Sequence, residues 1–253
     1  MNAYKKFSYC YDEVMQELDY HLWLDFTLPY LKPGDKVLDL ACGSGIFLTM
    51  LKLKGFDTTG LDLSETIIEI AKEKAKINRL DINFLVEDMT KFNLNEKFDC
   101  ITCFFDSVNF IENKKDLKEM FLRVSEHLNS GGYFIFDTFS KEMMKEYENH
   151  HLQEDHVTFT IDWKTTRNNN KLTHNIKITD EETYQEKYYE YYYDLKDFYL
   201  NDFNIIKICG DFNDDLMPED ERILYVLQKK GLWNNSVFTG LNFAVLFYCV
   251  RTD

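Results

Sequence analysis

Apolar residues recur at every third or fourth position along residues 1–31, which predicts amphipathic helices. Two stripes follow one another, and their members are Phe7, Tyr11, Val14, Met15 and Leu18, then Leu22, Trp23, Phe26 and Tyr30. Pro33-Gly34 then predicts a turn. We therefore expect residues 1–35 to form an N-terminal helical cap.

Between residues 36 and 140 the pattern alternates between short apolar runs and helical stripes. The predicted strands are Lys36–Ala41, Thr58–Leu61, Ile82–Val86, Phe98–Phe104 and Tyr133–Asp137. Short continuous apolar runs are typical of parallel strands that are covered on both faces. The clearest helical stripe runs from Leu117 to Leu128, and Gly131-Gly132 is expected to end that helix. Strands that alternate with helices predict a doubly wound α/β sheet.

A period of two replaces this pattern over residues 141–194. Val157, Phe159, Ile161 and Trp163 alternate with polar residues, and so do Leu172, His174, Ile176 and Ile178. Arg167-Asn168-Asn169-Asn170 predicts a hairpin turn, because asparagine tolerates the left-handed conformation. A third run, rich in tyrosine, follows at Thr183–Tyr193. These residues predict an antiparallel meander inserted into the α/β domain.

Two further apolar runs, Ile205–Cys209 and Arg222–Gln228, return the chain to the α/β domain, which we place at residues 36–140 and 195–230. Residues 231–253 form an apolar C-terminal tail to which no role is assigned. Its apolar stretch, residues 237–250, is shorter than the roughly 18–20 residues that span a bilayer. No membrane partner is therefore expected.

Acidic residues dominate the charge of the chain, with 44 Asp+Glu against 29 Lys+Arg and a net charge of −15. Such a surface repels phosphate backbones and anionic lipid and favours cationic or neutral small partners. Nucleic acid is an unlikely partner for the same reason.

The six cysteines lie mostly inside apolar runs, as buried thiols do in a reducing compartment, and residues 1–10 lack the apolar core of a secretory signal. We expect a cytoplasmic protein. Cys100 and Cys103 are three residues apart on a predicted strand, so they point to opposite faces and are not expected to bind metal together. His150, His151 and His156 fall in a polar linker and are read as solvated, so no metal is predicted.

The informative segment is Val37-Leu38-Asp39-Leu40-Ala41-Cys42-Gly43-Ser44-Gly45, a buried strand that runs into a Gly-x-Gly turn and a helix. Glycines allow a ligand to approach the backbone, and free N–H groups at a helix start attract negative groups. An ordinary tight turn would also explain this segment taken alone.

Two carboxylates strengthen the prediction of a nucleoside site. Asp62 follows the second strand about 20 residues after the glycines, where a carboxylate can accept hydrogen bonds from both ribose hydroxyls. Asp88 follows the third strand, where it can accept from an exocyclic amine while Met89 packs on the ring. Either aspartate could instead cap a helix. A nicotinamide fingerprint would need a third glycine at Leu48, and no Gly-Lys-Ser/Thr follows the turn to make a P-loop.

In their order and spacing these segments resemble the class I S-adenosylmethionine-dependent methyltransferases, over residues 4–230. Gly60-Leu61-Asp62-Leu63-Ser64, Glu87-Asp88-Met89 and Phe98-Asp99 continue the likeness after the glycine turn. The resemblance implies a Rossmann-like seven-stranded sheet with a reversed last strand. The N-terminal helices and the inserted meander look like a branch that acts on small molecules.

The resemblance also implies the roles of site residues. S-adenosylmethionine is the implied cofactor and S-adenosylhomocysteine the product. The implied cofactor-binding residues are Tyr11, Tyr20, Trp23, Asp39, Ala41, Gly43, Gly45, Asp62, Leu63, Asp88, Met89 and Phe104. Tyr11, Tyr20 and Trp23 could instead be plain core aromatics.

Asp106 and Ser107 follow the fourth predicted strand, beside the expected position of the methyl group, and with Tyr11 they are the catalytic candidates. Asp106 could hold an amine or accept its proton, or it could cap the next turn. The expected function is methyl transfer to a nitrogen or oxygen of a small molecule. The alternatives are an RNA or protein methyltransferase and a non-catalytic cofactor-binding module. The tyrosine-rich run could roof the pocket or support a homodimer through the inserted sheet.

Overall fold

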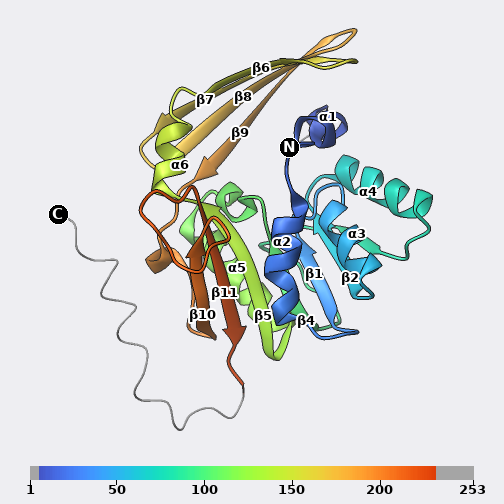
Figure 1. The fold of residues 1–253 in the computed structure, drawn as a ribbon, viewed down its shortest axis with the longest axis vertical. Helices are drawn as coiled ribbons and strands as arrows, with labels where there is room; N and C mark the ends of the chain where they lie inside the picture. The colour runs from blue at the N-terminus through green and yellow to red at the C-terminus, as the bar shows by residue number, and fades with distance from the viewer. Residues whose placement is uncertain (1–5, 232–253) are drawn as a thin grey trace, which may run out of the picture.

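A mostly parallel sheet of seven strands forms the centre of the computed structural model, which describes residues 6–231. The strands are β1 (Lys36–Leu40), β2 (Asp57–Asp62), β3 (Asn83–Val86), β4 (Phe98–Cys103), β5 (Leu128–Phe139), β10 (Phe203–Gly210) and β11 (Arg222–Lys229). Their order is β10-β11-β5-β4-β1-β2-β3, and β11 runs antiparallel to both of its neighbours. This confirms the predicted sheet and its reversed last strand (Figure 1).

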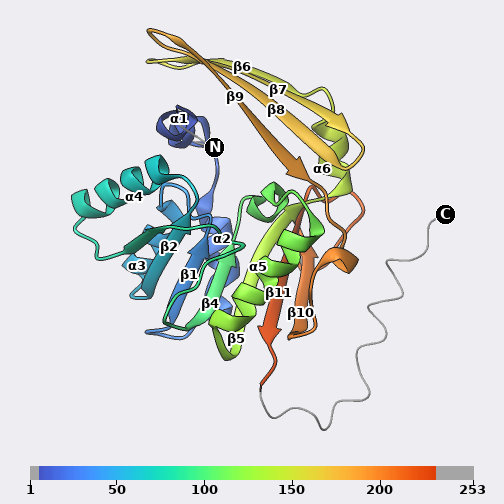
Figure 2. The same ribbon diagram turned by 180° about the vertical axis from the view of Figure 1, so that it is seen from behind.

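Helices cover both faces of this sheet, as the doubly wound prediction requires (Figures 1 and 2). They are α2 (Tyr20–Thr27), α3 (Ile46–Leu53), α4 (Glu65–Ile77) and α5 (Lys114–His127). Successive residues of a strand point to opposite faces. Val37 accordingly packs in one core cluster with α2, α3 and α4, and Leu38 in the other with α5. Cys100 and Cys103 of β4 likewise belong to different clusters.

The prediction that Gly131-Gly132 ends a helix is wrong. The helix α5 ends at His127, and the strand β5 begins at Leu128 with an extended backbone. The glycines lie inside β5, next to a break in its register with β4 between Phe98 and Cys100. Gly131 has φ +80° there, and a Cβ at Gly132 would lie 2.8 Å from the carbonyl oxygen of Asp99. The conformational freedom of these glycines is therefore used within an irregular strand and not at the end of a helix.

The inserted segment forms a second, antiparallel sheet in the order β6-β7-β8-β9, reached through the short helix α6 (Lys141–Glu146). Its strands are β6 (His151–Asp155), β7 (Thr160–Asn168), β8 (Lys171–Thr179) and β9 (Thr183–Tyr191). The predicted alternation on β8 is confirmed, and Asn169 turns the β7–β8 hairpin at φ +56°.

Two details of the insertion differ from the predictions. The segment predicted as a polar linker contains β6, an edge strand on which four of five residues are exposed. Val157 was predicted on the buried face, but it is 99% exposed because it lies in the turn before β7.

The helix α1 (Phe7–Val14) lies between the inserted sheet and the central domain (Figure 1). Phe7 and Cys10 pack with Ile161 and Ile178 of the inserted sheet. The Glu186 carboxylate of β9 accepts hydrogen bonds from the N–H groups of Lys6 and Phe7, so it satisfies free donors at the start of α1. Within residues 6–231, no helix has the length and apolar character needed to cross a membrane. The predicted C-terminal tail, apart from Gly231, lies outside the described residues.

Candidate active site

The Gly-x-Gly turn joins β1 to α3 through a run of left-handed backbone. Ala41, Gly43 and Gly45 have φ values of +53°, +54° and +77°. A side chain at Gly45 would also be obstructed, because its Cβ would lie 2.8 Å from the ring of Phe84. The turn therefore brings backbone N–H groups and the start of α3 to the carboxyl end of β1, where open α/β sheets bind ligands.

Asp62, at the end of β2, faces this turn. Its Oδ2 accepts a hydrogen bond from the N–H of Gly43 at 3.1 Å, and its Oδ1 accepts one from the N–H of Ser64 at 2.9 Å. Burial raises the pKa of this carboxyl, and the backbone donors oppose the shift. No cation pairs with Asp62 among residues 6–231. Each carboxylate oxygen has two acceptor positions, so Asp62 can accept further hydrogen bonds from ligand hydroxyls.

Asp39 lies beside Asp62 on the neighbouring strand, where β1 pairs with β2 through Asp39 and Gly60. Its side chain is buried and accepts a hydrogen bond from the Thr102 hydroxyl at 2.6 Å. Burial raises the pKa of Asp39 to about 7, with the nearby Asp62 adding to the shift. A buried and a half-buried carboxyl group, neither paired with a cation among the described residues, suit a ligand that carries both hydroxyl groups and positive charge.

A small cavity lies over Asp39 and the glycine turn. Its lining includes predicted site residues from four parts of the chain, namely Tyr11, Tyr20, Asp39, Ala41, Gly43, Phe104 and Ser107. The free space is about 40 Å³, which accommodates a few water molecules. This space is smaller than a nucleoside, and Asp62 is not part of the cavity lining.

The helix α1, which carries Tyr11, is held over the turn by polar contacts that the sequence did not indicate. Asp12 accepts a hydrogen bond from the Ser44 hydroxyl at 2.5 Å and forms an ion pair with Lys74 of α4. Each contact joins α1 to a segment beside the glycine turn. Asp12 thus ties the covering helix to the floor of the site.

Asp88 and Met89 are not brought into the cavity. The Asp88 carboxylate accepts hydrogen bonds from the N–H and hydroxyl of Thr90, at 2.8 and 2.7 Å, and pairs with Lys91. These bonds lower the pKa of Asp88 despite its partial burial. Met89 packs against the core. Leu63, by contrast, is largely exposed next to Asp62.

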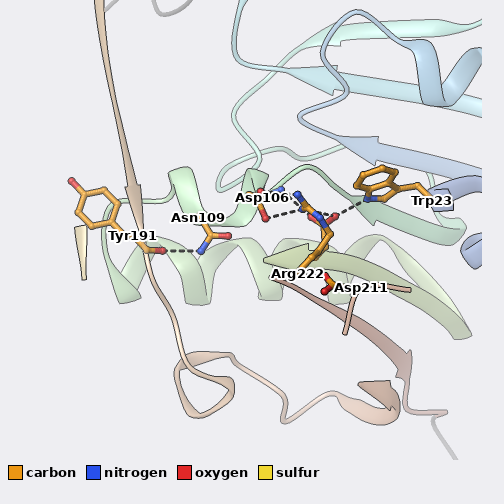
Figure 3. A network of polar contacts seen from close by, with 7 residues as sticks. Trp23, Asp106, Asn109, Tyr191, Asp211 and Arg222 are labelled. Carbon is orange, nitrogen blue, oxygen red and sulfur yellow. Dashed lines mark hydrogen bonds and ion pairs between the residues drawn. The ribbon is translucent and has the colours of Figure 1, made fainter. Parts of the chain in front are cut away.

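Trp23 and Asp106 lie together outside the cavity lining, in a buried polar network (Figure 3). The Trp23 indole N–H donates to Asp137 at 2.6 Å. Asp106, at φ +58°, accepts two hydrogen bonds from the Arg222 guanidinium, at 2.8 and 3.1 Å. Arg222 also lies 3.0 Å from Asp137. Burial raises the pKa of Asp106, and the charge of Arg222 opposes it.

Arg222 and Asp137 belong to this network although no sequence pattern indicated them. Arg222 begins an apolar strand, and Asp137 lies within one, so neither is marked by a local motif. The N–H of Arg222 is itself fixed by Asp211, which accepts it at 2.9 Å (Figure 3). The site candidates therefore divide into a cavity group around Asp39 and a network group around Asp106.

Comparisons with known proteins agree with this geometry. A methyltransferase domain matches residues 37–132, which include the glycine turn and Asp62. A putative methyltransferase of Geobacillus sp. (strain WCH70) is 28% identical over 251 residues, which cover 90% of this chain and 100% of the relative.

Solved structures extend the likeness to the inserted sheet. An S-adenosylmethionine-dependent methyltransferase from Clostridium acetobutylicum ATCC 824 superposes with a TM-score of 0.79 at 29% identity, covering 91% of this chain and 100% of that one. An amino pentose methyltransferase from Micromonospora echinaspora has a TM-score of 0.66 at 16% identity, covering 88% and 96% of the two chains, and shares the fold. Together these findings indicate a class I S-adenosylmethionine-dependent methyltransferase.

Proposed function

We propose that this methyltransferase acts on a nitrogen or oxygen of a small-molecule acceptor. The observation that carries the proposal is the position of α1, whose Tyr11 lines the cavity while the inserted sheet packs on the other side of this helix. A small concave site lined in this way favours a small acceptor over a large polymer. The net charge of −15 also disfavours a polyanionic acceptor.

The chain's own residues fit the cofactor. Asp62 would accept the ribose hydroxyls, and Asp39 with the turn at Gly43 and Gly45 would hold the methionine part, whose ammonium group suits a buried carboxylate. Leu63, exposed next to Asp62, offers an apolar surface for the adenine ring. Asp88 and Met89 would contact the adenine only if the Thr90 and Lys91 bonds of Asp88 rearranged.

The bound cofactor supplies a methyl group on a positively charged sulfur, ready for in-line displacement. The acceptor lone pair forms the new bond to carbon, the carbon–sulfur bond breaks with its electrons going to sulfur, and the acceptor releases a proton. The chain's task is then to align donor and acceptor and to exclude water, which is worth about 7–11 kcal/mol in well-oriented reactions. Phe104 and Tyr11 line the cavity and can do both, because aromatic faces also attract a sulfonium.

Ser107 faces the cavity directly after β4 and would orient the acceptor through its hydroxyl group. Asp106 is the proposed proton acceptor, and its raised pKa suits that role. Its two hydrogen bonds to Arg222 leave one acceptor position on each oxygen. Trp23 would act indirectly, by holding Asp137 against Arg222.

The direct test is a transfer assay with S-adenosylmethionine that carries an isotopically labelled methyl group. The purified chain is incubated with a cell extract, and label is followed by mass spectrometry in metabolites, protein and RNA. Label in a metabolite supports the proposal. Label confined to protein or RNA would overturn the small-molecule assignment, and cofactor binding without any transfer would indicate a non-catalytic module.

A further inference from the structure

Glu190, on β9 of the inserted sheet, is buried at the junction with the central domain. Its side chain lies near enough to Asp106 and Tyr147 for its charge to raise the pKa of both groups. Burial is the main cause that raises the pKa of Asp106, and the charges of Asp137 and Glu190 add to it. Glu190 is only 9% exposed. The junction therefore holds Asp106 and Asp137, which both contact the guanidinium of Arg222, and Glu190, whose charge acts on Asp106.

The side chain of Glu190 is held by a histidine of the neighbouring strand β8. His174 Nδ1 lies 3.1 Å from Trp163 Nε1, and the indole nitrogen can only donate, so Nδ1 must be the unprotonated acceptor. The ring proton is then on Nε2, which donates to Glu190 Oε2 at 3.1 Å. This hydrogen bond orients the Glu190 carboxylate.

A second, independent feature lies in the same place. Asn109, in the 3₁₀ turn η2 (Ser107–Phe110), is fully buried, and its Nδ2 donates to the carbonyl of Tyr191 at 2.9 Å. A carbonyl only accepts, so this bond identifies the two amide atoms. The remaining atom, Oδ1, is buried without a hydrogen-bond partner. Figure 3 shows that oxygen turned away from Tyr191, toward the side of Asp106.

The buried carboxylates at the junction and the unpartnered oxygen of Asn109 would be stabilised by the same kind of ligand. An unpaired buried carbonyl oxygen costs roughly 1–3 kcal/mol, which a donor can recover. Buried carboxylates that outnumber their cations are stabilised by an added positive charge. A protonated amine provides both, since it brings positive charge and several N–H donors, whereas an alcohol brings one donor and no charge.

We propose, building on the function above, that Glu190 and Asn109 form the acceptor subsite and that the acceptor is a small amine that binds as its cation. The bound ammonium group gives one proton to Asp106 before transfer, which frees the nitrogen lone pair that forms the new bond to the methyl carbon. The inserted sheet supplies Glu190, and η2, which follows β4, supplies Asn109. The two meet where β9 bonds to η2, so the insertion determines which acceptor reaches the methyl group. This subsite makes the enzyme an N-methyltransferase.

The first test uses the wild-type protein. A metabolite extract is separated at pH 7 on a cation exchanger, and the retained and unretained fractions are each incubated with methyl-labelled S-adenosylmethionine. Label in the retained, cationic fraction supports the proposal. Label only in the unretained fraction overturns the amine subsite while the small-molecule function stands. Absence of label in both, with cofactor binding demonstrated by calorimetry, contradicts the subsite and the proposed function together.

The second test uses Glu190→Gln, which keeps the shape and can still accept the His174 hydrogen bond. We expect the concentration of cationic fraction at half-maximal rate to rise about 10- to 100-fold, the range for loss of a charged hydrogen bond. Affinity for S-adenosylhomocysteine should not change. The matched control is Glu182→Gln, which removes the same charge from the exposed end of the β8–β9 hairpin. Equal kinetics in the two variants would contradict the assignment of Glu190. The wild-type fractionation decides the question if Glu190→Gln does not fold.

Discussion

The carboxylate of Asp106 and the guanidinium of Arg222 form a two-point ion pair, at 2.8 and 3.1 Å, across 116 positions of sequence. Asp106 follows β4, and Arg222 is the first residue of β11. The pair therefore joins two strand ends that lie on either side of β5 in the sheet. Because the guanidinium also contacts Asp137, one side chain balances charge from two buried carboxylates.

The first prediction concerns this pair. Arg222→Leu should lower the free energy of unfolding by about 3–5 kcal/mol, because it leaves two buried carboxylates without their cation. Arg222→Lys should recover part of this loss, since an ammonium keeps the charge but not the paired geometry. Urea unfolding, followed by circular dichroism, measures both. The control Asp214→Asn breaks the exposed Lys207–Asp214 pair and should give no measurable change. An equal free energy of unfolding for Arg222→Leu and wild type would show that the contacts of Arg222 with Asp106 and Asp137 do not stabilise the fold.

Most of the central sheet was predictable, because parallel strands buried on both faces leave continuous apolar runs in the sequence. The expected Lys36–Ala41 and Phe98–Phe104 each exceed the observed strand by one residue. The edge strand β6 was not predictable in this way, since its exposed polar residues show no alternation. The strand β6 forms because it pairs with β7, and that pairing leaves no hydrophobic pattern in its own sequence.

The site was predictable where one local segment contains the chemistry. The glycine turn and Asp62 lie at spacings that a motif describes, and the structure brings Gly43 and Asp62 within hydrogen-bond distance. The junction is different. Arg222 and Glu190 acquire their roles only when β11 and β9 fold back on the turn after β4, and nothing near them in the sequence indicates their partners.

The second prediction tests Asp62 as the ribose ligand. Asp62→Ala should weaken S-adenosylmethionine binding by about 2–3 kcal/mol, roughly 30- to 150-fold, because ligand hydroxyls lose a charged acceptor. Isothermal titration calorimetry gives the affinity. Asp57→Ala is the matched control, since Asp57 is an exposed aspartate at the opposite end of the same strand. Identical titration curves for Asp62→Ala and the control would remove Asp62 from the site.

The third prediction follows from the raised pKa of Asp39, about 7 in the folded protein. An unfolded aspartate titrates near pH 4, so between about pH 4 and 7 the folded state binds the extra proton. The free energy of unfolding should therefore fall as the pH rises through this range, by up to about 1.4 kcal/mol per pH unit from this group. Asp39→Asn removes this titrating group and its buried charge. The free energy of unfolding of the variant should therefore exceed that of wild type most at pH 7 and above, where Asp39 is ionised.

Chemical denaturation of the protein without cofactor, from pH 4.5 to 8.5, measures that difference. The exposed Asp25→Asn variant serves as control and should parallel wild type. A constant difference between Asp39→Asn and wild type across the range would show that Asp39 titrates normally. Asp39→Asn should also bind the cofactor more weakly, because a neutral amide offers less to an ammonium group.

The last prediction concerns the contacts that hold α1 over the cavity. The free space beside Tyr11 of α1 is about 40 Å³, so we expect α1 to move when the cofactor binds and when it leaves. Asp12→Ala removes the hydrogen bond from Ser44 and the ion pair with Lys74. If α1 is a gate, this change should raise the association and dissociation rates together, each roughly 2- to 10-fold.

Stopped-flow fluorescence measures both rates and so distinguishes movement of α1 from loss of a direct cofactor contact. Trp23, whose ring packs on Phe105 near the site, is one of the fluorescent groups. Loss of a direct cofactor contact would raise the dissociation rate alone and weaken the affinity, whereas a freer gate changes both rates and leaves their ratio close to that of wild type. Glu17→Ala, at an exposed position between α1 and α2, should leave both rates unchanged. An unaltered association rate in Asp12→Ala would show that the cofactor reaches its site without the displacement of α1.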